Sequence, residues 1–233
     1  MSKLYDKIKQ LQERREHQLA VLIDPDKADD LNRTIATLKK VRADIVLVGG
    51  SLVNTDTRAV VAQLKQHISQ PIILFPGNAS QFASNADALL LLSLISGRNA
   101  EYLIGQHVNA AVKIAQSGIE VIPTGYILID GGTPTSVQYM SDTQPIPNNK
   151  VDIATATALA GEQLGLKMIY LEAGSGAKIP VNDAIISSVR RAIDIPIIVG
   201  GGLRSMAEVE RVWSAGADIA VVGTAIENGE FEY

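Results

Sequence analysis

Residues that could do chemistry stand directly after short apolar runs in this sequence. Asp24 follows "LAVLI", and Ser51 follows "DIVLVGG". A carboxylate and a hydroxyl at the ends of adjacent strands suit Mg²⁺, which keeps several water ligands and takes the rest of its shell from substrate phosphates. Asp24 fits equally well as the cap of the turn that Pro25 begins. We expect Asp26 and Lys27, which follow, to serve the start of the next helix.

Another acidic residue, Glu172, follows the run "KMIYL". A carboxylate on an interior strand is costly to bury unless it has a partner. Glu172 can therefore bind substrate hydroxyls or act as a general base. The three histidines, at positions 17, 67 and 107, all fall on predicted helices and are expected at the surface. This placement disfavours histidine acid–base chemistry and a histidine metal site.

Glycine-containing segments follow three of the apolar runs: "EAGSGA", "VGGGLRS" and "VVGTA". Glycine lets backbone N–H groups approach an anion, and helix N-termini direct partial positive charge toward it. The segments therefore predict a phosphate site, although tight turns from strand to helix explain the glycines as well. The candidate residues are Gly174, Ser175, Gly176, Gly201, Gly202, Gly223 and Thr224.

Two further segments carry polar groups at predicted strand ends. "SGRN" offers Arg98 and Asn99 to an anion, although Arg98 can equally pair with a surface carboxylate. Residues 131–150 form a long polar connection that is rich in turn residues. Long connections of this kind after a barrel strand usually contribute to an active site.

The elements that position these residues alternate along the chain. Eight apolar runs are separated by longer segments, most of them amphipathic, which indicates βα units and a parallel sheet covered on both faces. The pattern predicts an α/β fold, a single (β/α)8 TIM barrel domain over residues 1–233, with an open doubly wound sheet as the alternative. The runs are 19–24, 44–50, 71–77, 88–95, 124–130, 167–174, 196–202 and 219–225.

The third connection, "NASQFASNAD", is too short for a usual crossover helix with its loops. We expect the third outer helix to be missing or replaced by a short segment, which leaves apolar strand faces to be covered. A bound hydrocarbon, neighbouring side chains or a second subunit would each cover them. The N-terminal helix is expected to cap the bottom of the barrel, and the last helix to be short.

Composition excludes several classes of function. The 233 residues carry a net charge of −4, so the broad basic face of a nucleic-acid-binding protein is not expected. The absence of cysteine excludes thiolate chemistry and cysteine-bound zinc. The charged N-terminus does not read as a signal peptide, and the strongest apolar stretch, 88–95, is too short to cross a bilayer. We expect a cytoplasmic protein without stable membrane insertion.

Taken in order, the segments "VLIDPDK", "VGGS", "FPGN", "GYILIDGG", "YLEAGSGA", "VGGGLRS" and "VVGTAIE" resemble the geranylgeranylglyceryl phosphate synthase family and its bacterial relatives. The resemblance spans nearly the whole chain. It implies a (β/α)8 barrel that uses Mg²⁺ to join a long-chain prenyl diphosphate, such as geranylgeranyl diphosphate, to the 3-hydroxyl of sn-glycerol 1-phosphate. The products are an ether-linked prenylglyceryl phosphate and diphosphate. A homo-oligomer is also expected.

The resemblance also implies roles for particular residues. Asp24 and Ser51 would hold Mg²⁺, and Glu172 would face the glycerol hydroxyls and accept a proton. Arg98, Asn99 and Tyr139 are candidates for contact with the diphosphate, and Tyr126 for the wall of the prenyl channel. Residues carried over to the glycerol phosphate site are Tyr170, Leu171, Glu172, Ala173, Gly174, Ser175, Gly176, Gly201, Gly202, Gly223 and Thr224.

One departure and two alternatives remain open. A branch of the family has a lysine where this chain has Leu22, so another group must meet the phosphate charge here. A different phosphate-binding barrel enzyme, such as a sugar-phosphate isomerase, would share the glycines, and Asp24 with Glu172 would supply its acid and base. A barrel that only stores or carries a phosphorylated ligand would bind it without turnover.

Overall fold

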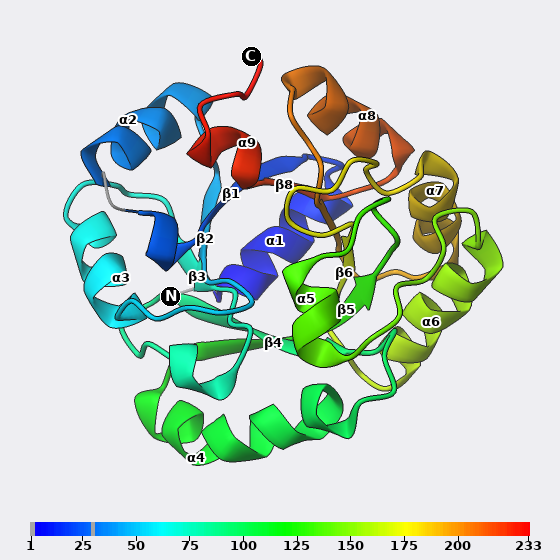
Figure 1. Cartoon of the computed structure of the whole chain (residues 1–233), viewed down its shortest axis with the longest axis horizontal. Helices are drawn as coiled ribbons and strands as arrows, with labels where there is room; N and C mark the ends of the chain where they lie inside the picture. The colour runs from blue at the N-terminus through cyan, green and yellow to red at the C-terminus, as the bar shows by residue number, and fades with distance from the viewer. Residues whose placement is uncertain (1–2, 29–30) are drawn as a thin grey trace.

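Each apolar run of the sequence becomes one strand of a closed parallel barrel in the computed structural model, which describes residues 3–28 and 31–233. The strands pair in chain order, and β8 pairs with β1 to close the barrel (Figure 1). The predicted (β/α)8 fold is therefore confirmed. The strands are β1 (Gln18–Ile23), β2 (Ile45–Val48), β3 (Ile72–Leu74), β4 (Ala88–Leu94), β5 (Glu120–Leu128), β6 (Met168–Glu172), β7 (Ile197–Gly200) and β8 (Ile219–Val222).

Both faces of these strands are buried, which explains why the runs are apolar throughout. In β2, Ile45 and Leu47 point into the barrel, whereas Val46 and Val48 pack outward with the core that lies against the helices. The same alternation in β6 turns Tyr170 inward and Leu171 outward. The two-residue period of a strand therefore decides which side chains reach the barrel interior.

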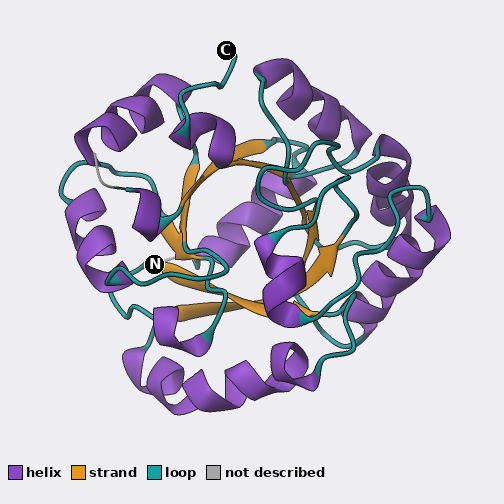
Figure 2. Ribbon diagram, viewed as in Figure 1, coloured by secondary structure: helices purple, strands orange, loops and turns teal. Residues whose placement is uncertain are grey.

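Helices surround the barrel, and one short helix, α5, lies over its open end (Figure 2). They are α2 (Leu31–Val41), α3 (Thr57–Lys65), α4 (Gln106–Ser117), α5 (Ser136–Ser141), α6 (Val151–Gln163), α7 (Asp183–Ala192), α8 (Met206–Ala215) and α9 (Thr224–Glu227). Residues 29 and 30, which belong to the helix expected after the first strand, lie outside the described residues. The last helix is short, as predicted.

Helix α1 (Leu4–Glu13) closes the end of the barrel where the strands begin (Figure 1). Glu120, at the start of β5, accepts hydrogen bonds from the N–H groups of Leu4 and Tyr5 at 2.7 and 2.9 Å. Ile8 is buried in the interior cluster of the barrel. The predicted cap at the bottom of the barrel is confirmed, so only the opposite end of the barrel is left for a site.

The third connection holds a single 3₁₀ turn, η2 (Ala79–Gln81), in place of an outer helix. Asn78 caps this turn, because its Oδ1 accepts from the Ser80 N–H at 2.9 Å. The following connection begins with one π-helical turn, η3 (Glu101–Gly105), which continues into α4. The missing third helix was predicted correctly, and it leaves β4 facing α4 across a gap.

The histidine prediction was correct only in part. His17 lies between α1 and β1, and His67 lies in the turn after α3, because both helices end earlier than the sequence pattern indicated. His107 is on α4, but it is half-buried and its Nε2 lies 3.2 Å from the Ser93 hydroxyl. Of the three, only His107 faces one of the cavities described below.

Candidate active site

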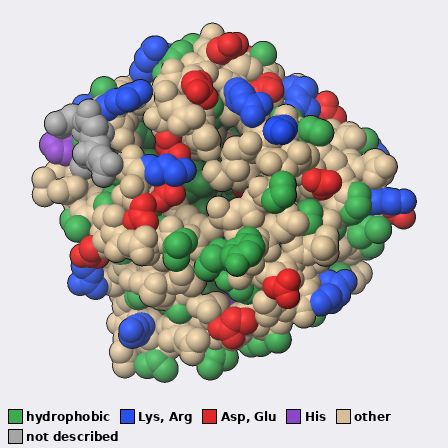
Figure 3. All heavy atoms as spheres, viewed as in Figure 1, with side chains coloured by type: hydrophobic (Ala, Val, Ile, Leu, Met, Phe, Trp, Pro, Cys, Tyr) green, Lys and Arg blue, Asp and Glu red, His purple; other side chains and the backbone are tan. Residues whose placement is uncertain are grey.

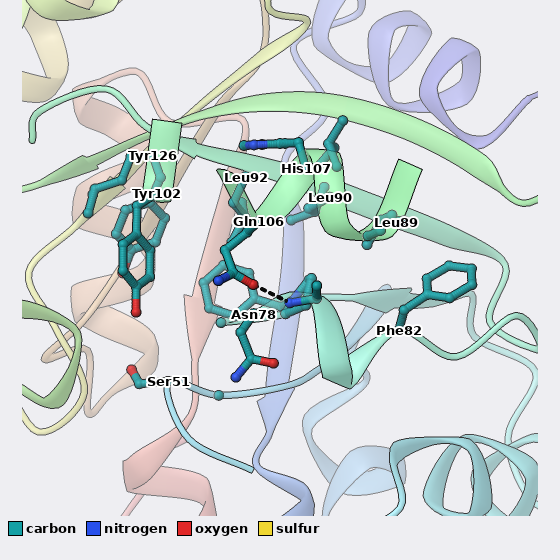
Figure 4. A pocket seen from close by; sticks show the side chains of 18 of the residues that line it. Ser51, Asn78, Phe82, Leu89, Leu90, Leu92, Tyr102, Gln106, His107 and Tyr126 are labelled. Atoms are coloured by element: carbon teal, nitrogen blue, oxygen red, sulfur yellow. Dashed lines mark hydrogen bonds between the residues drawn. The ribbon is translucent and has the colours of Figure 1, made fainter. Parts of the chain in front are cut away.

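An apolar groove lies where the third helix is missing. Figure 4 shows its side chains, most of which come from β4, α4 and the segment around η2. Together with its open side the groove contains about 870 Å³ of space. Its apolar lining includes Phe82, Leu89, Leu91, Leu92, Ala110 and Ile114.

Two glutamines hold the wall of this groove. Gln81 is buried, and its side chain accepts from the Gly77 N–H at 3.1 Å and donates to the Gly50 carbonyl at 2.8 Å. Gln106 on α4 accepts from the Ala79 N–H at 2.8 Å (Figure 4). These bonds join the short third connection to its neighbours on both sides. The wall of the groove is therefore held in a defined position.

A polar pocket opens at the ends of the strands, next to the groove. Figure 3 shows the hollow near the centre of this face, with charged side chains beside it. Asp24, Glu172 and Thr224 line this pocket, together with residues from the loops after β6 and β7. The same end of the barrel was predicted to carry the chemistry.

The groove and the polar pocket share one wall. Phe75 and Tyr126 line both cavities, and Tyr170 packs against them with ring centroids 5.1 and 5.4 Å away. Gly50, Ser51 and Val137 also line both cavities. A ligand with an apolar tail and a polar head can therefore pass from one cavity into the other at Ser51.

Asp24 and Ser51 both line the polar pocket, in agreement with their positions after adjacent strands. A methyl group on Gly50, the residue before Ser51, would lie 3.5 Å from Asp24 Oδ1. Asp24 also caps the 3₁₀ turn η1 (Pro25–Lys27), because its Oδ1 accepts from the Asp26 N–H at 3.1 Å. The two roles predicted for Asp24, in the pocket and in the turn, are compatible.

The donor set at Asp24 suits Mg²⁺. The Asp24 side chain keeps 22% of its surface exposed, and no hydrogen bond within the described part of the chain occupies the Ser51 hydroxyl. Among the described residues, no group of three histidine, cysteine or acidic side chains could hold a metal ion. A cation here would take most of its ligands from water and substrate oxygens, as Mg²⁺ does and as structural zinc does not.

Lys27 and Glu227 also line the polar pocket. Neither residue was assigned to the site from the sequence. Lys27 Nζ is 3.1 Å from Glu227 Oε2 and 3.7 Å from Asp24 Oδ2, and the Asp24 N–H donates to Glu227 Oε1 at 3.2 Å. Lys27 was expected to serve the start of a helix. Its pairing with Glu227 joins the first and last βα units, which closure of the barrel brings side by side.

Asp26 joins two loops of the site, which is more than the helix-start role predicted for it. Its carboxylate accepts from the N–H groups of Asn54 and Thr55 at 2.9 and 2.7 Å. These bonds lower the pKa of Asp26 to about 2, so it is ionised at any ordinary pH. The loop that carries Ser51 is thereby tied to the turn that carries Asp24.

Glu172 lies on the inner face of the barrel at the end of β6 and is 6% exposed. Loss of water raises its pKa to about 7, although a hydrogen bond of 2.7 Å from the Gly174 N–H opposes the shift. The Tyr170 hydroxyl is buried beside Glu172, and its interaction with the carboxylate also lowers the pKa of Glu172, although the two groups do not form a hydrogen bond of regular geometry. Burial raises the pKa of Tyr170 well above its usual value, so this hydroxyl stays protonated and can donate to a ligand.

Glycines and hydroxyls from three loops form a cradle beside Glu172. Ser175 and Thr224 lie with their hydroxyl oxygens 3.0 Å apart. Gly201 has φ +87°, and a Cβ there would lie 2.5 Å from Glu172 Oε1, so only glycine fits. Of the predicted phosphate residues, those that line the pocket are Ser175, Gly176, Gly201, Gly202, Gly223 and Thr224.

Three residues carried over to the glycerol phosphate site do not line the pocket. Leu171 and Ala173 point outward into the core under the helices, because they alternate with Tyr170 and Glu172 along the strand. Gly174 is buried, and its N–H is used by Glu172. These positions shape the strand and its turn, and the side chains of Leu171 and Ala173 cannot reach a ligand in the pocket.

The three residues predicted for the diphosphate lie outside both cavities, whereas Tyr126, predicted for the prenyl channel, lines both. Arg98 donates to the carbonyls of Gly97 and Ile95, and Asn99 donates to the Ser141 carbonyl. Tyr139 is 86% exposed on α5. The long loop does reach the site, but through Ser136, Val137 and Met140 of α5, which line the cavities.

The fold and the two adjoining cavities define a (β/α)8 barrel with an apolar groove beside a polar pocket. The sequence profile of the PcrB family matches residues 9–233. The chain belongs to the PcrB family, and the resemblance drawn from its motifs is confirmed. Within the described residues, no helix has the length and apolar character to span a membrane.

Named relatives agree with this assignment. Geranylgeranylglyceryl phosphate synthase of Spirosoma linguale is 51% identical over 211 residues, which cover 89% of this chain and 85% of the relative. The protein of the same name from Zunongwangia profunda is 44% identical over 234 residues and covers 100% of both chains. The structure of (S)-3-O-geranylgeranylglyceryl phosphate synthase from Thermoplasma acidophilum in complex with sn-glycerol-1-phosphate has a TM-score of 0.90 at 30% identity, covering 97% of this chain and 92% of that one.

Proposed function

We propose that this protein transfers a long prenyl group, most favourably geranylgeranyl, from its diphosphate to the 3-hydroxyl of sn-glycerol 1-phosphate. The single observation that carries the proposal is the shared wall of the groove and the polar pocket, at Ser51, Phe75 and Tyr126. An apolar chain in the groove would place its diphosphate end at Asp24. The names of the relatives support the same reaction.

The cradle would hold the glycerol phosphate. Backbone N–H groups around Gly201, Gly202 and Gly223 can surround a phosphate, and the hydroxyls of Ser175 and Thr224 can donate to its oxygens. The glycerol would then extend toward Glu172 and the buried Tyr170 hydroxyl beside it. A sugar-phosphate isomerase would have no use for the apolar groove, which favours the prenyl transfer.

Asp24 and Ser51 would hold Mg²⁺. When bound, the cation would neutralise the negative charge that develops on the leaving diphosphate. Glu227 and Lys27 border this position and would set its local charge. The donor set described above supports Mg²⁺ as the cofactor.

Glu172 would orient the glycerol 3-hydroxyl and accept its proton. The hydroxyl oxygen bonds to the allylic carbon of the prenyl group as the bond from that carbon to the diphosphate oxygen breaks, and the electron pair leaves with the diphosphate. A carboxylate with a pKa of about 7 is suited to this role, since it is partly ionised at neutral pH and still basic. The products are the prenylglyceryl ether phosphate and diphosphate.

The whole chain would act as one domain in the cytoplasm, at the start of ether-lipid synthesis. We also propose a homo-oligomer. Ile104, Val108 and Val112 form an exposed apolar stripe along η3 and α4, since residues spaced by four share a helix face. Such a stripe suits a contact with a second copy.

A product assay tests the proposed reaction. Purified protein is incubated with Mg²⁺, sn-glycerol 1-phosphate and prenyl diphosphates of increasing length, with and without EDTA. We expect prenylglyceryl phosphate, formed fastest from one chain length and lost with EDTA. No product from any length, with either enantiomer of glycerol phosphate, would refute the proposal and leave the isomerase or the non-catalytic carrier.

A substitution in the groove tests where the prenyl chain lies. Ala110 on α4 lines the groove and is 6% exposed, so Ala110→Phe would fill space that a long chain needs. We expect the rate with the longest accepted diphosphate to fall roughly tenfold and shorter ones to be favoured. The control is Ala111→Phe, the same change at an exposed position on the same helix. Equal chain-length profiles for the two variants would place the prenyl group elsewhere.

A further inference from the structure

The polar pocket has an excess of acidic side chains, although a phosphate is proposed to bind there. Its charged lining consists of Asp24, Glu172, Glu227 and Glu230 against Lys27 and Arg204. Lys27 is already paired with Glu227 and close to Asp24. On the phosphate side, Leu22 lies beside Gly223 and offers no charge. The phosphate therefore needs a cation from elsewhere in the lining.

Hydrogen bonds on both sides hold the main chain at Arg204 in place. Its N–H donates to Glu208 Oε2 at 2.6 Å, and its carbonyl accepts from the Glu232 N–H at 2.9 Å. The Met206 N–H donates in turn to the Glu232 carbonyl at 2.8 Å, so the segment after β7 is paired with residues near the C-terminus. Phe231, in the same terminal segment, is buried. The backbone of Arg204 is thereby held at the rim of the cradle.

The guanidinium of Arg204 is directed along the same rim. Its Nη2 donates to the Ala177 carbonyl at 2.8 Å, directly after Gly176 of the cradle. Arg204 has no ion-pair partner among the described residues. Four of the five N–H donors of a guanidinium remain for another ligand when one is used, and its planar fork matches the oxygens of a phosphate.

We propose that Arg204 binds the phosphate group of the glycerol phosphate substrate and supplies the positive charge that Leu22 cannot. This inference rests on the proposed function for the identity of the ligand, and on the geometry of the pocket for the phosphate itself. The Ala177 carbonyl that binds the guanidinium directly follows Gly176 and would lie 3.0 Å from a Cβ on Gly202, so the guanidinium is held next to the cradle. Arg204 thus adds a charged side chain to a site otherwise built from main chain and hydroxyls.

Calorimetric titration with sn-glycerol 1-phosphate, and separately with inorganic phosphate, tests this role without any prenyl substrate. We expect Arg204→Gln to raise Kd about tenfold for both ligands, and Arg204→Lys to recover part of the loss. Binding to the unaltered protein should weaken more steeply with added salt than binding to Arg204→Gln, because the variant lacks one charge contact. A merely structural arginine would not change this salt dependence.

The control is Arg58→Gln, which removes an exposed arginine on α3 that lies outside both cavities. Unchanged phosphate affinity and salt dependence in Arg204→Gln would overturn the proposal, as would a lack of phosphate binding to the unaltered protein. Thermal unfolding of each variant shows whether it is folded. If Arg204→Gln does not fold, the partial loss of phosphate affinity expected for Arg204→Lys provides the test. Phosphate binding that depends on Arg204, without prenyl transfer, would refute the proposed reaction while leaving this inference intact.

Discussion

Asp24→Asn should lower the rate of prenyl transfer by roughly three orders of magnitude. The variant keeps the size of the side chain and one oxygen that can accept from the Asp26 N–H, so the turn η1 should persist. It removes the negative charge that would hold Mg²⁺, and charge stabilisation by such a cation is worth several kcal/mol in the transition state. Initial rates measured against Mg²⁺ concentration would show a weaker apparent affinity for the metal together with the lower rate.

Asp56→Asn is the matched control for this experiment. Asp56 caps α3 from the neighbouring loop, is exposed, and lies outside both cavities, and asparagine is an equally good cap. Its rate and Mg²⁺ dependence should equal those of the unaltered protein. A direct readout is Mn²⁺ binding followed by electron paramagnetic resonance in the presence of diphosphate. If Asp24→Asn bound Mn²⁺ normally and kept its rate within a few-fold, Asp24 would not be the metal ligand.

Glu172→Gln should lower kcat by about 10²–10⁴-fold, because glutamine can orient a hydroxyl but cannot accept its proton. The amide oxygen can still accept from the Gly174 N–H, so the turn after β6 is retained. The KM for glycerol phosphate should change far less than kcat. If KM rose while kcat stayed the same, Glu172 would be assigned to substrate binding alone. Unchanged kcat and KM would remove it from the mechanism.

The pH dependence gives a second test of Glu172. Its pKa of about 7 predicts that kcat/KM rises as the pH increases through 7 and levels off above it, because the base must be ionised. The residual activity of Glu172→Gln should not show this step. If kcat/KM of the variant also rose near pH 7, another group would be responsible for the titration.

Glu172 should also reduce the stability of the protein at high pH. Because its folded pKa of about 7 lies above the ordinary value of 4.5, the folded chain holds the proton more tightly than the unfolded chain. Stability is therefore lost as the pH rises from 4.5 through 7, by an amount on the order of 3 kcal/mol. Glu172→Gln should unfold at a higher temperature than the unaltered protein at pH 8, and the difference should shrink at pH 5.

Sequence patterns located much of this site because strands have a simple geometry. The end of each apolar run marks the end of a barrel strand, so the order of residues alone places Asp24, Ser51 and Glu172 at one face of the barrel. The alternation of side chains also separates Tyr170 from Leu171, a distinction that treating residues 170–176 as one segment overlooked. The two-residue period of the strand would have shown that the side chains of Leu171 and Ala173 point away from the pocket.

The sequence by itself determined the barrel, the short third connection and the rim of glycines and carboxylates, because each depends on neighbours along the chain. Tertiary structure decided which distant groups meet. Lys27 pairs with Glu227 only because β8 closes on β1, and Arg204 reaches Ala177 only because the loops after β6 and β7 lie side by side. Arg98 and Asn99, which were expected to contact a diphosphate, donate hydrogen bonds to main-chain carbonyls. Periodicity reports which way a residue faces, whereas a partner far along the chain is set by closure of the barrel and packing of its loops.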